Sequence, residues 1–130
     1  MLSLIMVTHF DLGGALIRSA REILGNLPLP TMLLNVDNQQ PPEQIRQQAL
    51  DLIAKAPQKN PILFLTDLYG STPHNVAESL DSDHTIKVVS GVNLPMLLRI
   101  FNYHYLPFEE VVKKAIEGAH NGIVGHTTAS

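Results

Sequence analysis

Short apolar runs alternate along this chain with longer segments in which apolar residues recur every three or four positions. The runs fall at about residues 2–7, 31–36, 61–66 and 85–90, and polar residues or helix breakers bound each of them. Runs of this kind are typical of strands that are buried on both faces of a parallel sheet. The pattern therefore predicts four short parallel strands.

Five other segments have the apolar spacing of amphipathic helices. Pro42, Pro73 and Pro95 mark the starts of three helices, Gly25-Asn26 ends the first, and the last covers about residues 108–119. The predicted inward positions are Leu16, Ala20, Ile23 and Leu24, then Ile45, Ala49, Leu52 and Ile53, then Val76, Ala77 and Leu80, then Met96, Leu97 and Leu98, and finally Val111, Val112, Ala115 and Ile116.

The alternation of strands and helices predicts an α/β fold. We expect a small, doubly wound, mainly parallel sheet in the order 2-1-3-4, with helices on both faces and right-handed crossovers. A single domain should cover residues 1–125, and residues 126–130 should form a loose polar tail. The strand order is the step that depends on analogy with known sheets rather than on the residues.

Composition narrows the class of protein. With 130 residues, of which 45% are hydrophobic, the chain can form a stable hydrophobic core without covalent cross-links. It has no cysteine, which excludes disulfides, thiolate catalysis and cysteine-ligated zinc. A net charge of −3 argues against general electrostatic binding to nucleic acid. The first apolar run is too short to span a bilayer and lacks the flanks of a signal peptide, so we expect a cytoplasmic protein.

Polar residues stand where the first and third predicted strands end. His9 follows the first strand and Asp67 follows the third. In the order 2-1-3-4 these strands flank the switch point, where sheets of this class bind their ligands. We therefore expect the imidazole and the carboxylate to lie beside each other. An imidazole oriented by a carboxylate keeps one tautomer and offers its other nitrogen as a nucleophile.

Two further segments suit the binding of an anion. Gly70–Pro73 reads as a helix start with Thr72 at the N-cap, and backbone N–H groups there favour a phosphate, so Ser71 and Thr72 are candidate phosphate-binding residues. After the fourth strand, Asn93 can donate to an anion or cap the next helix. A nucleophile, its orienting carboxylate and anion donors together suit phosphoryl transfer.

Three stretches resemble one known family: Val7–His9, Leu65–Asn75 and Gly91–Leu97. The family is the IIA component of the mannose class of the bacterial phosphoenolpyruvate-dependent sugar phosphotransferase system. The spacing agrees across nearly the whole chain, and the combination is specific although each piece alone is a weak signal.

The resemblance implies a phosphocarrier. His9 would accept a phosphoryl group from the histidine-containing phosphocarrier protein and pass it to a histidine of a IIB component. Asp67 would hold Nδ1 of His9, so that Nε2 is phosphorylated, while Thr72 and nearby N–H groups hold the phosphate. The resemblance also implies a homodimer, no metal or other cofactor, no nucleic acid, and contact with a membrane only through a transporter complex.

The chain departs from the family pattern in several places. Members often read Gly-Gly-Ser-Pro-Phe-Asn where this chain has Gly70–Asn75, although Thr72 keeps the hydroxyl. His74 stands where members often have an aromatic residue, and only Gly122–Val124 could serve as the C-terminal strand that joins dimers in well-known members. We expect a partner surface around the crevice, formed by Phe10, Leu68, Tyr69, His74 and Leu94. The remaining histidines, His84, His104, His120 and His126, lack the spacing of a zinc motif, so no metal site is expected.

Other functions stay open at this point. A stand-alone regulatory phosphoprotein would keep the chemistry of His9 and differ in its target, and so would the phosphocarrier subunit of a dihydroxyacetone kinase. A non-enzymatic α/β binding module would not be phosphorylated at all. Taken singly, Asp67, Thr72 and Asn93 could be ordinary turn or capping residues. The sequence names neither a sugar nor the downstream acceptor.

Overall fold

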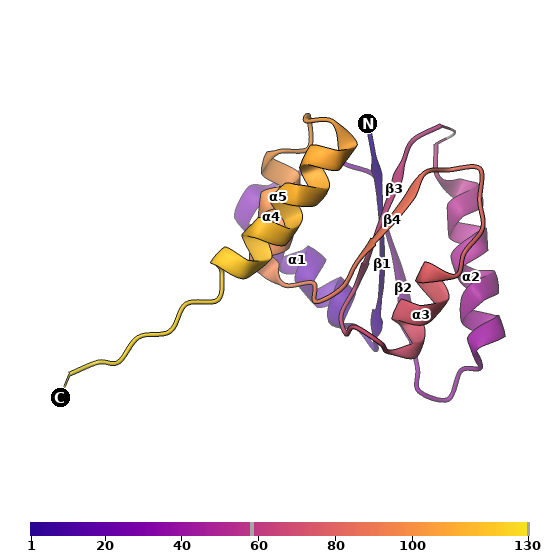
Figure 1. Ribbon diagram of the computed structural model, residues 1–130, viewed down its shortest axis with the longest axis horizontal. Helices are drawn as coiled ribbons and strands as arrows, with labels where there is room; N and C mark the ends of the chain where they lie inside the picture. The colour runs from indigo at the N-terminus through magenta and orange to yellow at the C-terminus, as the bar shows by residue number, and fades with distance from the viewer. Residues whose placement is uncertain (58, 130) are drawn as a thin grey trace.

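The computed structural model describes residues 1–57 and 59–129, and strands alternate with helices along most of the chain (Figure 1). The strands are β1 (Ser3–His9), β2 (Thr31–Val36), β3 (Ile62–Thr66) and β4 (Ile86–Val89). The helices are α1 (Leu12–Leu24), α2 (Pro42–Lys55), α3 (Thr72–Glu78), α4 (Leu94–Asn102) and α5 (Phe108–Asn121). All the predicted strands and helices are therefore present, with boundaries that differ by a few residues.

The sheet is parallel and has the order β2-β1-β3-β4, which confirms the predicted arrangement. β1 lies between β2 and β3, with Val7 opposite Thr66 in β3 and His9 opposite Val36 in β2. Because the strands are parallel, their carboxyl ends meet at one edge of the sheet. The segments that follow β1, β2 and β3 are thereby gathered at that edge.

Each face of the sheet has its own apolar core, as the alternation of side chains along a strand requires. Leu4 and Met6 of β1 face α1, α4 and α5, whereas Ile5 and Val7 face α2 and α3. Figure 1 shows these two groups of helices on opposite sides of the sheet. The predicted cover on both faces is confirmed.

The edge strands differ from the prediction that every strand is buried on both faces. β1 and β3 are buried along almost their whole length. In β2, by contrast, Leu33 and Asn35 are exposed, and in β4 Lys87 is exposed. The helices pack over the two central strands, so the outer strands keep part of one face in contact with water.

Two of the predicted inward side chains are exposed, Ile23 in α1 and Ile116 in α5, at 57% and 41%. Each lies roughly 100° around its helix from the centre of the buried stripe, because one residue turns an α-helix by about that angle. In α1 the buried stripe passes through Ile17, which the sequence interpretation left out. The predicted stripes were too wide by one position.

After α5 the chain leaves the body of the molecule as an extended segment (Figure 1). Residues 123–129 form neither helix nor strand, and the side chains of Ile123 and Val124 are exposed. The predicted loose tail covers 126–129 of the described residues, and Ser130 lies outside them. None of the described helices is both long and apolar enough to cross a membrane.

Ser3 of β1 offers a test of how this core tolerates a polar group. Its side chain is completely buried, and Oγ has no hydrogen-bond partner among the described residues. Ser3→Ala should raise the free energy of unfolding by about 1 kcal/mol, because it removes a buried hydroxyl that lost its water without gaining a partner. Urea denaturation measures the change.

Thr8→Val is the matched control for Ser3→Ala. The Oγ1 of Thr8 is equally buried, but it accepts a hydrogen bond from the backbone N–H of Gly13 at 2.8 Å. This variant should lower the free energy of unfolding by about 1 kcal/mol. A loss of stability in both variants would show that the hydroxyl of Ser3 is not an unpaired group.

Candidate functional site

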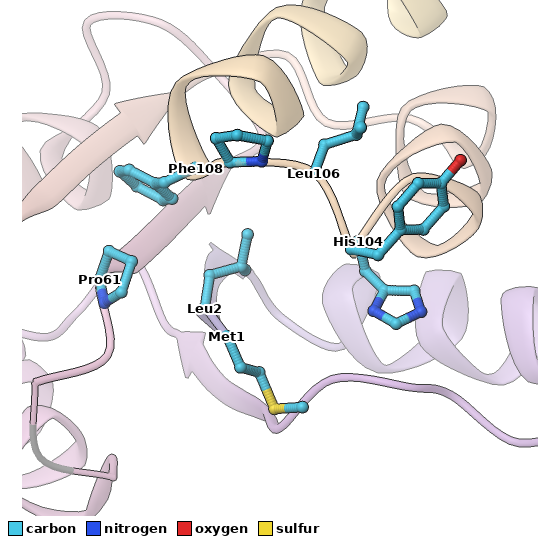
Figure 2. Close-up of a pocket in the computed structure, with 8 residues that line it drawn as sticks. Met1, Leu2, Pro61, His104, Leu106 and Phe108 are labelled. Carbon is cyan, nitrogen blue, oxygen red and sulfur yellow. The ribbon is translucent and has the colours of Figure 1, made fainter.

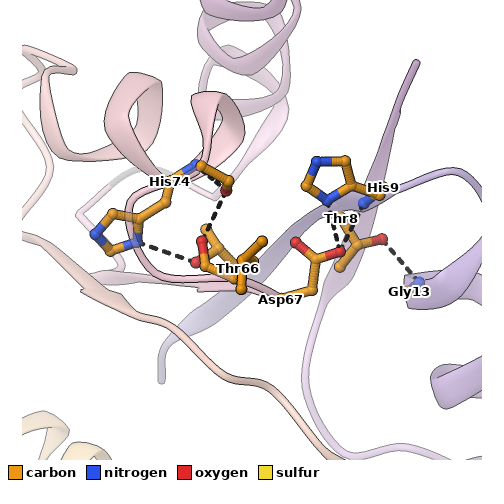
Figure 3. Close-up of polar contacts among 8 residues, drawn as sticks. Thr8, His9, Gly13, Thr66, Asp67 and His74 are labelled. Atoms are coloured by element: carbon orange, nitrogen blue, oxygen red, sulfur yellow. Dashed lines mark hydrogen bonds and ion pairs between the residues drawn. The ribbon is translucent and has the colours of Figure 1, made fainter. Parts of the chain in front are cut away.

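His9 and Asp67 are brought together at the carboxyl edge of the sheet. His9 is the last residue of β1, and Asp67 follows directly after the neighbouring β3. One carboxylate oxygen, Oδ2 of Asp67, accepts a hydrogen bond from the backbone N–H of His9 at 2.9 Å and lies 2.9 Å from Nδ1 of its ring. Figure 3 shows both contacts converging on that oxygen. The predicted pairing of these two residues is therefore present in the structure.

The contact selects one form of the imidazole. An ionised carboxylate can only accept hydrogen bonds, so the proton of the neutral ring lies on Nδ1, which donates a hydrogen bond to Asp67. Nε2 then keeps its lone pair and can act as a nucleophile. The His9 side chain is 29% exposed and that of Asp67 only 9%, so the ring can be reached from outside while its partner is shielded.

The backbone on both sides of His9 is held in place. Oγ1 of the preceding Thr8 accepts a hydrogen bond from the backbone N–H of Gly13 at the start of α1. A Cβ atom on residue 13 would lie only 2.9 Å from that oxygen, so glycine is needed for this close approach. The following Phe10 has a φ of +49°, in the left-handed region that costs energy for residues other than glycine. Its N–H donates to the carbonyl of Val36 at 2.9 Å. The chain thus turns sharply after His9 and is tied to β2.

A cavity of about 60 Å³ opens beside the ring of His9. One water molecule occupies about 30 Å³ in the liquid, so the cavity suits a small group rather than a sugar. The residues that line it are His9, Val36, Asp37, Asn38, Gln40, Ile45, Thr72 and Pro73. The sequence interpretation did not select Asp37, Asn38 or Gln40. The sequence does contain a signal that could have identified these residues, because they follow β2, and the carboxyl end of β2 adjoins that of β1.

The candidate phosphate-binding residues in the α3 region separate in the structure. Thr72 lines the cavity beside His9. Ser71 is the N-cap of α3 in place of the predicted Thr72, and its Oγ accepts from the N–H of His74 at 3.4 Å and donates to the carbonyl of Leu68 at 2.7 Å. The hydroxyl of Ser71 is therefore used within the chain. Thr72 is the better placed of the two for an incoming group.

Asn93 does not line the cavity at His9. It caps α4, where its Oδ1 accepts from the N–H of Met96 at 2.9 Å, and its Nδ2 donates to the carbonyl of Ala119 in α5 at 3.3 Å. It lines a separate cavity between β4 and α5. One donor of the Asn93 amide is thus engaged with α5, and the phosphate contact expected of this residue stays a prediction.

The predicted partner surface is exposed in part. Phe10, Leu68 and Tyr69 are 62%, 59% and 77% exposed, and they flank His9 and Asp67 in the chain. Large apolar side chains in water at such a place can dock against another protein. Leu94 is half-buried and packs against the core formed with α1, α4 and α5.

The structure corrects the placement of His74, which is buried rather than on the rim, with 3% of its surface exposed. Nε2 of His74 donates to Glu78 at 2.6 Å, so Nδ1 accepts from the hydroxyl of Thr66 at 3.1 Å. Figure 3 shows the contact with Thr66. The four-residue spacing on α3 places Glu78 next to His74. The ring of Tyr69 packs on the imidazole with the ring centroids 4.9 Å apart. The buried ring of His74 is therefore in contact with the exposed ring of Tyr69.

A larger cavity, of about 360 Å³, lies at the opposite edge of the sheet (Figure 2). Met1, Leu2 and Pro61 line it where β1 and β3 begin, and Leu106 and Phe108 add to its apolar wall. Its lining includes His104, but no carboxylate side chain of the described residues. This cavity is larger than the one at His9, but an oriented nucleophile favours the smaller one, and chemistry is the better guide to a reactive site.

The site at His9 is equipped for nucleophilic attack by an imidazole on a small group. The oriented ring and the shielded carboxylate suit this chemistry, and Thr72 lines the same cavity. Across the described ranges, no three His, Asp or Glu side chains gather closely enough to hold a metal ion.

Comparison with known proteins gives one family and several relatives. Residues 3–116 match the model of the EIIA-man family, described as the PTS system fructose IIA component. The chain is 33% identical over 105 residues to the PTS system fructose-specific EIIA component of Bacillus subtilis, a match that covers 78% of this chain and 70% of that protein.

Solved structures show the same likeness. The phosphotransferase system component EIIA of Streptococcus agalactiae superimposes with a TM-score of 0.83 at 30% identity, over 96% of this chain and 97% of that one. The mannose/sorbose-specific IIA subunit of Enterococcus faecalis also has a TM-score of 0.83, over 99% and 97% of the two chains, but its 20% identity shows the fold alone.

The contact between Thr66 and His74 generates a stability prediction. His74→Ala should lower the free energy of unfolding by about 2 kcal/mol, because the buried hydroxyl of Thr66 loses its partner and a cavity is left. In a Thr66→Val background the same change should cost less, since no hydroxyl is left unpaired. Urea denaturation of the two single variants and the double variant measures the difference, with His126→Ala in the tail as control. Strictly additive costs would contradict the contact.

Proposed function

We propose that this chain, which belongs to the EIIA-man family of phosphotransferase system IIA components, carries a phosphoryl group on Nε2 of His9. The observation that supports this most directly is the 2.9 Å contact between Nδ1 of His9 and Oδ2 of Asp67. It leaves Nε2 with a lone pair in a ring that borders a small cavity. A group of that size is what a phosphocarrier must accept.

A IIA component works between two proteins, the histidine-containing phosphocarrier protein and a IIB component. We infer that both would approach this chain at the carboxyl edge of the sheet, since His9 is reached from there. Phe10, Leu68 and Tyr69 are the exposed apolar side chains closest to His9 and Asp67 in the chain, so they are the proposed contact residues. The regulatory and kinase alternatives would use the same His9 and differ only in the acceptor.

The proposed transfer is a direct displacement at phosphorus. Nε2 of His9 attacks with its lone pair and forms the new P–N bond, while the P–N bond to the donor histidine breaks and its electrons return to the donor nitrogen. The proton stays on Nδ1 of His9, so the phosphorylated ring becomes cationic. Asp67, 2.9 Å away, stabilises that charge as it develops.

The return step follows from the same arrangement. A phosphoryl group on a cationic imidazole has a good leaving group, because the ring departs as neutral imidazole with its proton still on Nδ1. Asp67 thus serves both directions by keeping one tautomer throughout the cycle. Thr72, in the wall of the same cavity, is proposed to donate its hydroxyl to a phosphoryl oxygen in each direction.

His9→Ala tests the proposed acceptor. The protein is incubated with phosphoenolpyruvate, the first enzyme of the system and the histidine phosphocarrier, and its intact mass is measured. Wild type should gain one acid-labile phosphoryl group and the variant none, although its fold should be unchanged because the side chain is partly exposed at a strand end. A gain in the variant would assign the chemistry to another histidine, and no gain in wild type with a charged donor would overturn the proposal.

Asp67→Ala tests the orienting carboxylate. The rate of phosphoryl acceptance should fall by about 100-fold without reaching zero, because a poorly oriented ring still carries a nucleophilic nitrogen. Rapid-quench measurements with the charged phosphocarrier give the rate. Asp51→Ala, which removes an exposed carboxylate on α2, is the matched control. An Asp67 variant as fast as the control would show that the 2.9 Å contact does not contribute to transfer.

A further inference from the structure

The turn between β2 and α2 forms part of the wall of the cavity at His9. We propose that this turn, Asp37–Gln40, sets how tightly the phosphoryl group is held, with Asn38 donating to its oxygens and Asp37 repelling them. The inference rests on the proposed function, because it concerns the same cavity. It adds to His9 and Asp67 two residues with opposite effects on the stability of the phosphorylated state.

The position of the turn follows from the register of the sheet. Val36, the last residue of β2, lies opposite His9, the last residue of β1, and its carbonyl accepts the N–H of Phe10 at 2.9 Å. Asp37 follows Val36 directly in the sequence. The turn therefore begins one residue beyond the point where His9 ends its strand, and both Asp37 and Asn38 border the cavity.

Four hydrogen bonds hold the turn in one shape. Oδ1 of Asp37 accepts from the N–H of Gln39 at 2.7 Å, and the carbonyl of Asp37 accepts from the N–H of Gln40 at 3.1 Å. Oε1 of Gln40 accepts from the N–H of Asp37 at 2.8 Å, while its Nε2 donates to Gln48 of α2 at 3.0 Å. The turn is thus closed on itself and attached to a helix, so its backbone already has one shape when an anion arrives.

Asn38 borders the cavity, and its side chain is not used to build the turn. It is exposed, and its amide makes no hydrogen bond with other described residues. A side-chain amide offers two N–H donors, and donors to a charged phosphoryl oxygen form strong hydrogen bonds. Asn38 is therefore suited to the role that the sequence interpretation gave to Asn93, whose amide is engaged with Ala119.

Asp37 places a negative charge at the border of the same cavity. Like charges repel, so this carboxylate raises the free energy of the phosphorylated state relative to the free protein. A carrier needs such an opposing influence, because a group that is held too firmly is not passed on. The side chain is exposed, so the repulsion should be modest and should weaken as salt increases.

The test is the equilibrium ratio of phosphorylated to free protein, measured by intact mass in mixtures with the charged histidine phosphocarrier. Asn38→Ala should lower the ratio about tenfold, and Asn38→Asp, which keeps the size but replaces the donor with a charge, should lower it further. Asp37→Asn keeps the oxygen that receives Gln39 and should raise the ratio roughly three- to tenfold. Gln47→Ala, on the exposed side of α2, is the matched control and should equal wild type.

Salt separates a charge effect from a structural one. The change caused by Asp37→Asn should shrink markedly at 1 M salt, where the Debye length falls to about 3 Å, whereas a distorted turn would give the same change at any salt. Urea denaturation confirms that each variant is folded. If wild type is phosphorylated and the Asn38 and Asp37 variants match the control, the inference fails while the proposed function holds. If wild type gains no phosphoryl group, both fail.

Discussion

The carboxylate of Asp67 accepts two hydrogen bonds from one residue, the backbone N–H and the ring Nδ1 of His9, through the same oxygen. These contacts join the ends of the two central strands and set the direction of the ring. They exist only because β1 and β3 are parallel neighbours, so that both strand ends reach the same edge of the sheet. The cavity, the exposed rim and the chemistry proposed for Nε2 all depend on that pairing.

Hydroxyl groups next to the two site residues complete the arrangement. Thr8 precedes His9 and receives the N–H of Gly13, while Thr66 precedes Asp67 and donates to the buried His74. Each hydroxyl satisfies a polar group that would otherwise lie unpaired in the core, where such groups are costly. The result is a pair of strand ends that carry polar chemistry without weakening the apolar sheet behind them.

The surroundings of His9 combine attraction and repulsion for a phosphoryl group. In the proposed transfer, Asp67 would stabilise the cationic ring and Thr72 and Asn38 would donate to phosphoryl oxygens, whereas Asp37 would add a like charge to the phosphate. A carrier must receive and release the same group, which favours moderate binding over tight binding. The small volume of the cavity, about 60 Å³, agrees with a site that holds the transferred group alone.

The sequence by itself determined the elements of the fold and the pair at its centre. Apolar runs located the strands, and the polar residues at their ends, His9 and Asp67, were identified because parallel strands gather their carboxyl ends. Local sequence patterns could not determine which side chains contact a helix or strand that is distant in the chain. His74 looked like a surface group, but Thr66 on β3 and Glu78 on α3 hold it inside. Asn93 and Asn38 both follow strands, and only the tertiary structure shows that Asn93 is bonded to Ala119 of α5 whereas Asn38 borders the cavity at His9.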